Sequence, residues 1–194
     1  MRLNRLALTA ALAASAVFAG CTTTLPTTAN TQASAAQQRQ SINSAADETL
    51  NRLYQQAPDS RALIQRAHAV LVFPEVLSGA FVVGFEHGVG VLRVKGAQQG
   101  YYTTTGGSIG WQAGAQSKAM VLVFTDAAAY EKFRNSNGWT IGADATVAVA
   151  NIGANGSIDT QTARQPVVGF VLNNGGLMAG VSIDGTRIAR ANNL

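Results

Sequence analysis

Few residues of this chain have the types and spacing that catalysis or metal binding requires. The 194 residues include one cysteine, Cys21, and two histidines, His68 and His87. Nucleophilic catalysis needs a serine or cysteine beside a histidine that a carboxylate orients, and a metal site needs several ligands at suitable spacing. The two histidines are 19 residues apart and have no cysteine near them. We therefore expect no enzyme activity, no catalytic residue, no metal site and no cofactor.

Carboxylates that could form an acid–base pair are also dispersed along the chain. A catalytic pair requires two carboxyl groups facing one bond of the substrate, whereas here they occur singly at expected turns and strand ends. Glu86 and His87 are expected at a hairpin turn, with both side chains in solvent. The scattered carboxylates are Glu75, Glu86, Asp126, Asp144, Asp159 and Asp184.

The clearest chemical prediction concerns the lone thiol of Cys21. Arg2 and Arg5 precede an apolar run over residues 6–18, and the small pair Ala19-Gly20 follows it. This layout is typical of an export signal, and the run is too short to span a bilayer. Because the cysteine follows the small pair directly, residues 1–20 resemble a bacterial lipoprotein signal peptide, after which Cys21 is acylated with fatty acids such as palmitate. An ordinary secretory signal with an incidental cysteine is the alternative.

The net charge of the mature chain and the residue after Cys21 bear on its partners and its location. Cleavage before Cys21 would leave 174 residues with a formal net charge of +2, because Arg2 and Arg5 leave with the signal. So small a charge argues against nucleic acid as a partner. Gram-negative lipoprotein sorting uses an aspartate after the cysteine for retention in the inner membrane, and here the residue is Thr22. We expect an exported protein that is lipid-anchored to the outer membrane and faces the periplasm.

The region after the cysteine predicts a tether followed by two helices. Residues 21–40 have almost no bulky apolar residue and no periodicity, so we expect a flexible tether. Apolar residues at helical spacing begin near Ile42 and predict a helix that ends before Pro58, and Asp59 offers the N-cap of a shorter one. Both helices are amphipathic, which favours packing on the domain's own core, with lipid contact as the alternative.

Strand-like segments dominate from Val70 onward, interrupted by one helix with Asp126 as its N-cap. Helices that precede a mostly antiparallel sheet indicate the α+β class, here with one inserted helix. The expected strands cover residues 70–74, 80–86, 89–95, 100–104, 108–116, 120–124, 140–149, 167–172 and 177–183.

Glycine is unusually frequent inside these segments. A glycine within a strand marks a bulge, a sharp bend or a close backbone approach. We therefore expect the N-terminal helices to pack on a strongly coiled, Gly-rich sheet or half-barrel. The glycines concerned are Gly84, Gly90, Gly110, Gly114, Gly142, Gly153, Gly169 and Gly180.

Five motifs, in order, resemble those of the SYLF domain family, and the resemblance covers roughly residues 40–190. They are residues 70–76 (VLVFPEV), 88–96 (GVGVLRVKG), 107–116 (GSIGWQAGAQ), 142–147 (GADATV) and 175–186 (GGLMAGVSIDGT). On this basis we expect residues 41–194 to form one SYLF-like domain.

The resemblance implies a phospholipid-binding module, notably for phosphoinositides, and some members also bind actin. Neither ligand is expected in a bacterial envelope. Candidate headgroup contacts are Arg61, Arg66, Arg93 and Lys118. We expect a lipid-anchored envelope protein whose domain binds phospholipid or the membrane surface without catalysis. The alternative is an envelope scaffold that binds a protein partner through a sheet edge or the helix pair.

Overall fold

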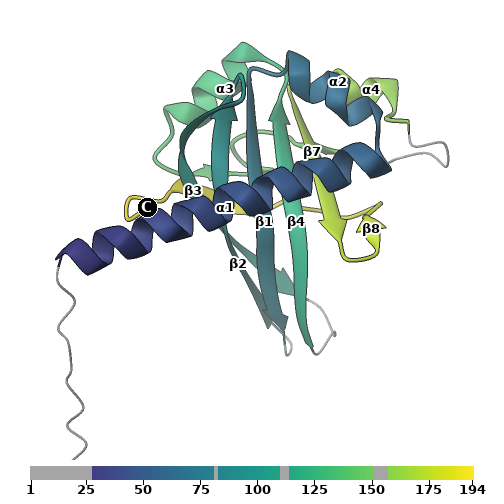
Figure 1. Cartoon of the computed structure of the whole chain (residues 1–194). Helices are drawn as coiled ribbons and strands as arrows, with labels where there is room; N and C mark the ends of the chain where they lie inside the picture. The colour runs from purple at the N-terminus through teal and green to yellow at the C-terminus, as the bar shows by residue number, and fades with distance from the viewer. Residues whose placement is uncertain (1–27, 81–82, 110–113, 151–156) are drawn as a thin grey trace, which may run out of the picture.

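In this computed structural model, residues 28–80, 83–109, 114–150 and 157–194 are described. They form four helices and nine strands (Figure 1). The helices are α1 (Thr28–Gln56), α2 (Asp59–Arg66), α3 (Ala127–Arg134) and α4 (Thr160–Ala163). The strands are β1 (Ala69–Ala80), β2 (Val83–Val94), β3 (Ala97–Ile109), β4 (Gly114–Phe124), β5 (Trp139–Thr140), β6 (Ala148–Val149), β7 (Val167–Asn173), β8 (Gly176–Leu177) and β9 (Arg187–Arg190).

The strands form one curled sheet in the order β5-β9-β3-β2-β1-β4-β7-β6, and β8 pairs with β7. Among the described residues every strand pairing is antiparallel except that of β6 with β7. The long helix α1 crosses one face of this half-barrel (Figure 1). The predicted α+β class and the coiled, mostly antiparallel sheet are therefore confirmed.

The central strands are buried on both faces. In β1, Val70 and Val72 point into a core shared with α1 and α2, whereas Leu71 and Phe73 point into a second core that includes Phe133 of α3. Successive side chains of a strand alternate between the two faces of a sheet. A strand covered on both faces therefore needs an unbroken apolar run. β4 and β7 follow the same pattern, so these three strands hold both cores together.

β1 does not stop at Pro74, as the sequence predicted, but continues to Ala80. Its pairing with β2 shifts register between Val72 and Glu75, so the proline lies in a bulge. Proline donates no hydrogen bond to the ladder, and a bulge accommodates it while bending the strand.

Gly90 of β2 lies against this bulge. A Cβ atom at Gly90 would lie 2.5 Å from the carbonyl oxygen of Val72 and 2.6 Å from Cδ1 of Phe73. The neighbouring Gly88 is equally tight, since its Cβ would lie 2.6 Å from the carbonyl oxygen of Glu75. The expectation that strand glycines permit close approach is confirmed at Gly90, whereas Gly110 and Gly153 lie outside the described residues.

Two assignments in the central strands are wrong. A turn was expected at His87-Gly88, but β2 runs without interruption from Val83 to Val94. One strand was expected over residues 108–116, but β3 ends at Ile109 and β4 begins at Gly114. Glycine favours turns and also permits close strand packing, so local sequence does not separate the two roles.

The C-terminal third departs further from the sequence prediction. The expected strand over residues 140–149 is reduced to β5 and β6 at its two ends, and only Leu177 of the expected strand over residues 177–183 lies in β8. β9 and α4 were not predicted. The expected inserted helix is α3, and its cap is confirmed because Asp126 Oδ2 accepts a hydrogen bond from the Ala129 N–H at 3.0 Å.

Helix α1 begins at Thr28, so the prediction of a flexible tether is wrong for residues 28–40. These residues are rich in alanine and glutamine, which favour helix intrinsically. A helix also propagates easily from a segment that packing already holds. The predicted signal peptide, Cys21 and Thr22 lie outside the described residues. No helix in the described part of the chain has the length and apolar character needed to cross a membrane.

The tight contact at Gly90 gives a direct test of the bulge. Gly90→Ala should lower the free energy of unfolding by about 1–3 kcal/mol, because the new methyl group meets the backbone of β1 and overpacks the site. Gly79→Ala is the matched control, since a Cβ there has no atom within 4 Å, and it should change stability by less than about 0.5 kcal/mol. Urea unfolding of both variants measures the difference, and equal values would contradict this account.

Candidate functional site

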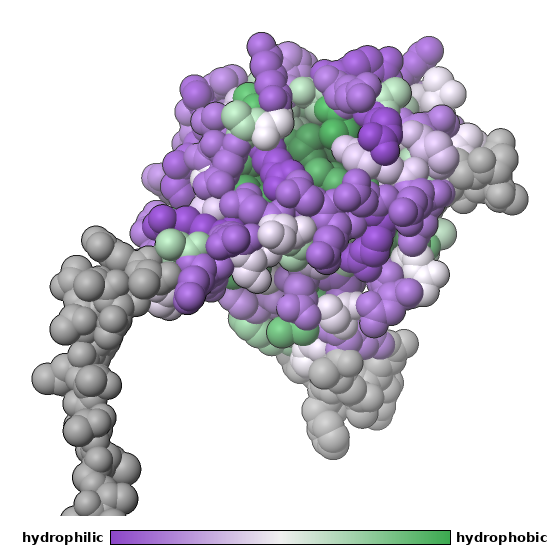
Figure 2. Space-filling model, viewed as in Figure 1, coloured by the Kyte–Doolittle hydropathy of each residue, from purple (hydrophilic) through white to green (hydrophobic). Residues whose placement is uncertain are grey.

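A recess opens between α1, α2 and the adjoining ends of β1 and β2, and we call it the α1–α2 recess. Its volume is about 630 Å³, within the range of small-molecule sites in proteins. Figure 2 shows it as a hollow with an apolar floor above α1. The lining residues are Asp47, Leu50, Asn51, Tyr54, Ile64, Gln65, Ala67, Ala69, Val70, Arg93, Lys95 and Gly96.

The recess exists because two helices with apolar faces meet the sheet at different places. The apolar residues of α1 recur at intervals of three and four and are buried against the sheet, and the stripe consists of Ile42, Ala46, Leu50, Leu53 and Ala57. The chain then reverses at Pro58, and α2 buries Leu63 while Ile64 stays partly exposed. Ala67 follows α2 and Ala69 begins β1, and the small side chains of both leave the space between the helices unfilled.

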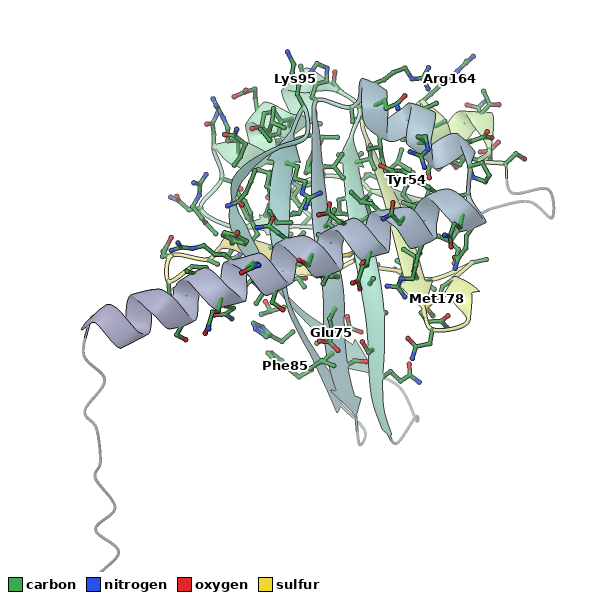
Figure 3. All side chains as sticks on the ribbon, viewed as in Figure 1. Tyr54, Glu75, Phe85, Lys95, Arg164 and Met178 are labelled. Carbon is green, nitrogen blue, oxygen red and sulfur yellow. The ribbon has the colours of Figure 1, made fainter. Side chains whose placement is uncertain are left out.

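Two basic side chains stand at the β2 end of the recess. Arg93 is largely buried, and its Nη1 lies 2.5 Å from Oδ1 of Asp47 on α1 while its Nη2 donates to the carbonyl oxygen of Asn43 at 3.2 Å. Lys95 is exposed at the end of the molecule where β2 turns into β3 (Figure 3). No ion pair involving Lys95 occurs among the described residues. The rim therefore carries one neutralised cation and one available cation.

Tyr54 forms the wall of the recess on α1. The guanidinium carbon of Arg61 lies 4.2 Å from the centroid of the Tyr54 ring, a cation–π contact that places a third basic group beside the recess. Burial raises the pKa of the Tyr54 phenol above its usual 10.0, although Arg61 and Arg93 oppose this shift. The phenol is therefore neutral at physiological pH and can donate a hydrogen bond.

The four basic residues that sequence analysis selected do not form one cluster. Arg61 and Arg93 lie at the α1–α2 recess, and Arg66 lines a different recess beside α4. Lys118 lies on β4, where its Nζ contacts Oε1 of Glu86 at 2.9 Å. Sequence analysis missed Lys95, although its neighbour Gly96 is a turn residue that could have placed it at a loop tip.

Glu86 and His87 were expected at a hairpin turn in solvent, but both lie within β2. The side chains of Glu86 and Lys118 are only 16% and 17% exposed. The ring of His87 instead stacks on Phe85 with 6.4 Å between centroids. Among residues 28–80, 83–109, 114–150 and 157–194, no three histidine, cysteine, aspartate or glutamate side chains are placed to hold a metal ion.

A second surface lies on the part of the sheet that extends beyond α1 (Figure 1). We call it the β finger, formed by residues 75–80, 83–88, 105–109 and 114–118. Leu77 and Phe85 are 55% and 63% exposed, and Phe85 is labelled on the finger in Figure 3. β7 pairs with β4 over residues 119–124 and does not extend along residues 114–118.

The comparisons with known proteins bear on the C-terminal part of the chain. Residues 105–194 match the model of the Ysc84 family, which is described as Las17-binding protein actin regulator. A search among curated proteins gives no match. The family match confirms the SYLF resemblance over these residues. The lining of the α1–α2 recess comes entirely from residues 47–96, upstream of the matched region.

The Lys118–Glu86 pair gives a test of whether Lys118 is structural. Lys118→Met should lower the free energy of unfolding by about 1–3 kcal/mol, because it leaves the Glu86 carboxylate largely buried without its partner. Arg134→Met is the control, because Arg134 and Glu131 form an exposed pair and its loss should cost less than about 0.5 kcal/mol. Thermal or urea unfolding measures both. If Lys118→Met were as stable as Arg134→Met, the Lys118–Glu86 pair would not contribute to the stability of the fold.

Proposed function

Residues 105–194 of this chain belong to the SYLF domain family, and from this premise we propose that the protein binds phospholipid at a membrane surface without catalysis. The observation that carries the proposal is the α1–α2 recess, which combines an apolar floor with basic groups at its rim. The family is associated with lipid or actin-related binding. A lipid is the ligand that matches the chemistry of the recess.

A phospholipid presents an acyl chain and an anionic phosphate side by side. The floor of the recess offers Leu50, Ile64 and Val70 to the chain, and each buried methylene contributes about 0.8 kcal/mol. Lys95 at the rim is available to the phosphate, and a basic group near an anionic membrane surface contributes about 1 kcal/mol. A few methylenes and one or two cations therefore suffice for weak, reversible binding.

We further propose that acylated Cys21 anchors the protein to the outer membrane, where it faces the periplasm. Stable anchoring takes more than one acyl chain, which an acylated lipoprotein cysteine supplies. Recruitment then does not depend on the recess, whose contact with lipid can be local. We do not extend actin binding to this chain, because the proposed compartment contains none.

Vesicle binding by a chain that begins at Thr28, and so lacks Cys21, tests the role of the recess. It should float with vesicles of phosphatidylglycerol and phosphatidylcholine, and added salt should weaken this binding. Lys95→Glu should weaken it about tenfold, because a rim cation becomes an anion. Arg134→Glu makes the same charge change on α3 and should have little effect.

Asp47→Asn should change vesicle binding in the direction opposite to Lys95→Glu. It removes the carboxylate that neutralises Arg93, so binding to anionic vesicles should become severalfold tighter. Absence of salt-sensitive binding, or equal losses in the Lys95 and Arg134 variants, would show that the recess does not bind phospholipid.

The β finger favours a second candidate function, a scaffold that binds an envelope protein. Its support is the exposed pair Leu77 and Phe85 on the part of the sheet along which β7 does not extend. A double variant, Leu77→Ser with Phe85→Ser, should leave vesicle binding unchanged if phospholipid is the ligand. A single stoichiometric protein crosslinked to the native chain but not to this variant, together with no vesicle binding, would favour the scaffold.

A further inference from the structure

A second recess lies on the other side of α2, between that helix and α4, and we call it the α2–α4 recess. Its volume is about 390 Å³, and it is lined by Leu63, Arg66, Thr125, Thr160, Ala163 and Arg164. The two arginines come from parts of the chain about 100 residues apart, so the fold alone brings them to one place. None of these lining residues is acidic.

Neither arginine is neutralised by a carboxylate. No ion pair within the described ranges includes Arg66 or Arg164. Arg66 donates from Nε to the carbonyl oxygen of Ala62 at 3.2 Å. This bond orients the guanidinium and does not use its Nη groups. Two like charges that share a recess repel each other. An anion between them would remove this repulsion.

The adjacent carboxylate, Asp159, is engaged elsewhere. Its Oδ2 accepts hydrogen bonds from the backbone N–H of Thr162 at 3.0 Å and from the Thr162 hydroxyl at 3.1 Å. These bonds, the backbone one first, lower the pKa of the Asp159 carboxyl. Asp159 is therefore ionised and caps α4 rather than pairing with Arg66 or Arg164.

The donors that remain match a phosphate group. An arginine presents a planar fork of N–H groups that fits two oxygens of one phosphate, and such charge-assisted bonds are among the stronger ones in proteins. The Thr160 hydroxyl adds a short, uncharged donor, while Leu63 and Ala163 supply an apolar wall. The Thr125 hydroxyl donates a hydrogen bond to the carbonyl oxygen of Gln165, so Thr125 lines the recess but has no hydroxyl proton left for a ligand.

We propose that the α2–α4 recess is a binding site for a phosphate oxyanion, held by Arg66 and Arg164. This goes beyond the proposed function, because the oxyanion is either a lipid headgroup or a free phosphate compound. Figure 3 shows Arg164 and Lys95 at the same end of the molecule. Leu63 and Ile64, adjacent on α2, line the two recesses, so a lipid headgroup in one recess would lie near a lipid in the other.

Titration calorimetry with inorganic phosphate tests the site on the full chain carrying Cys21→Ser. Binding should be saturable at millimolar or lower phosphate. Arg66→Gln and Arg164→Gln should each weaken it about tenfold through loss of a charge-assisted pair, and Arg164→Lys should recover part of the loss because it restores charge without the fork. Arg134→Gln removes the same charge from α3, outside both recesses, and should leave phosphate affinity unchanged.

Vesicle flotation of the same variants separates the two sources of phosphate. Reduced binding to phosphatidylglycerol vesicles in Arg66→Gln and Arg164→Gln, with competition by free phosphate, identifies a lipid headgroup. Unchanged vesicle binding with lost phosphate affinity identifies a free phosphate compound. Either result supports the site. No saturable phosphate binding by the folded native chain, or an equal loss in Arg134→Gln, overturns it. If only the proposed function were wrong, Lys95→Glu would not weaken vesicle binding, while inorganic phosphate would still bind at the α2–α4 recess.

Discussion

The fold depends on the burial of β1, β4 and β7 between two apolar cores. Every side chain from Val70 to Phe73 belongs to one core or the other, so no position in that run can be polar without loss of packing on one side. The bulge at Pro74 bends β1 where this double burial ends, and Gly88 and Gly90 let β2 follow the bend without a Cβ in the way. β1 and β2 therefore stay in close contact at this bend because the two glycines leave room for the backbone of β1.

The same constraint decides where ligands can bind. Because both faces of the central strands are filled, the two recesses described above lie where covering elements leave the sheet. Helix α2 is short and meets the sheet beyond the end of α1, so a recess forms on each of its sides. The two recesses differ because Leu50, Ala67 and Ala69 lie under one, whereas two arginines from separate segments line the other. The elements that flank α2 therefore determine that one recess is largely apolar and the other basic.

Sequence reasoning succeeded where a pattern is local. The apolar spacing from Ile42 to Ala57, the Asp126 cap and the unbroken run at Val70 each reflect one element's own surroundings. It failed at His87-Gly88 and at Pro74, where the partner strand determines whether a glycine or proline ends a strand. It selected Arg61 and Arg93, which the fold places at one recess, but it could not join Arg66 to Arg164, because that proximity depends on the tertiary fold. Lys118 looked available, yet β2 supplies Glu86 to pair with it.

Helix α1 changes how an anchored domain would meet a membrane. A flexible tether lets a domain sample many orientations, whereas a helix of 29 residues is a rod about 43 Å long. The C-terminal half of this rod is buried on the sheet through Leu50 and Leu53, so the rod and the domain move together. For a protein anchored through Cys21 as proposed, α1 and the domain would therefore approach the membrane as one body, and α1 would limit the orientations in which the α2 end can contact lipid.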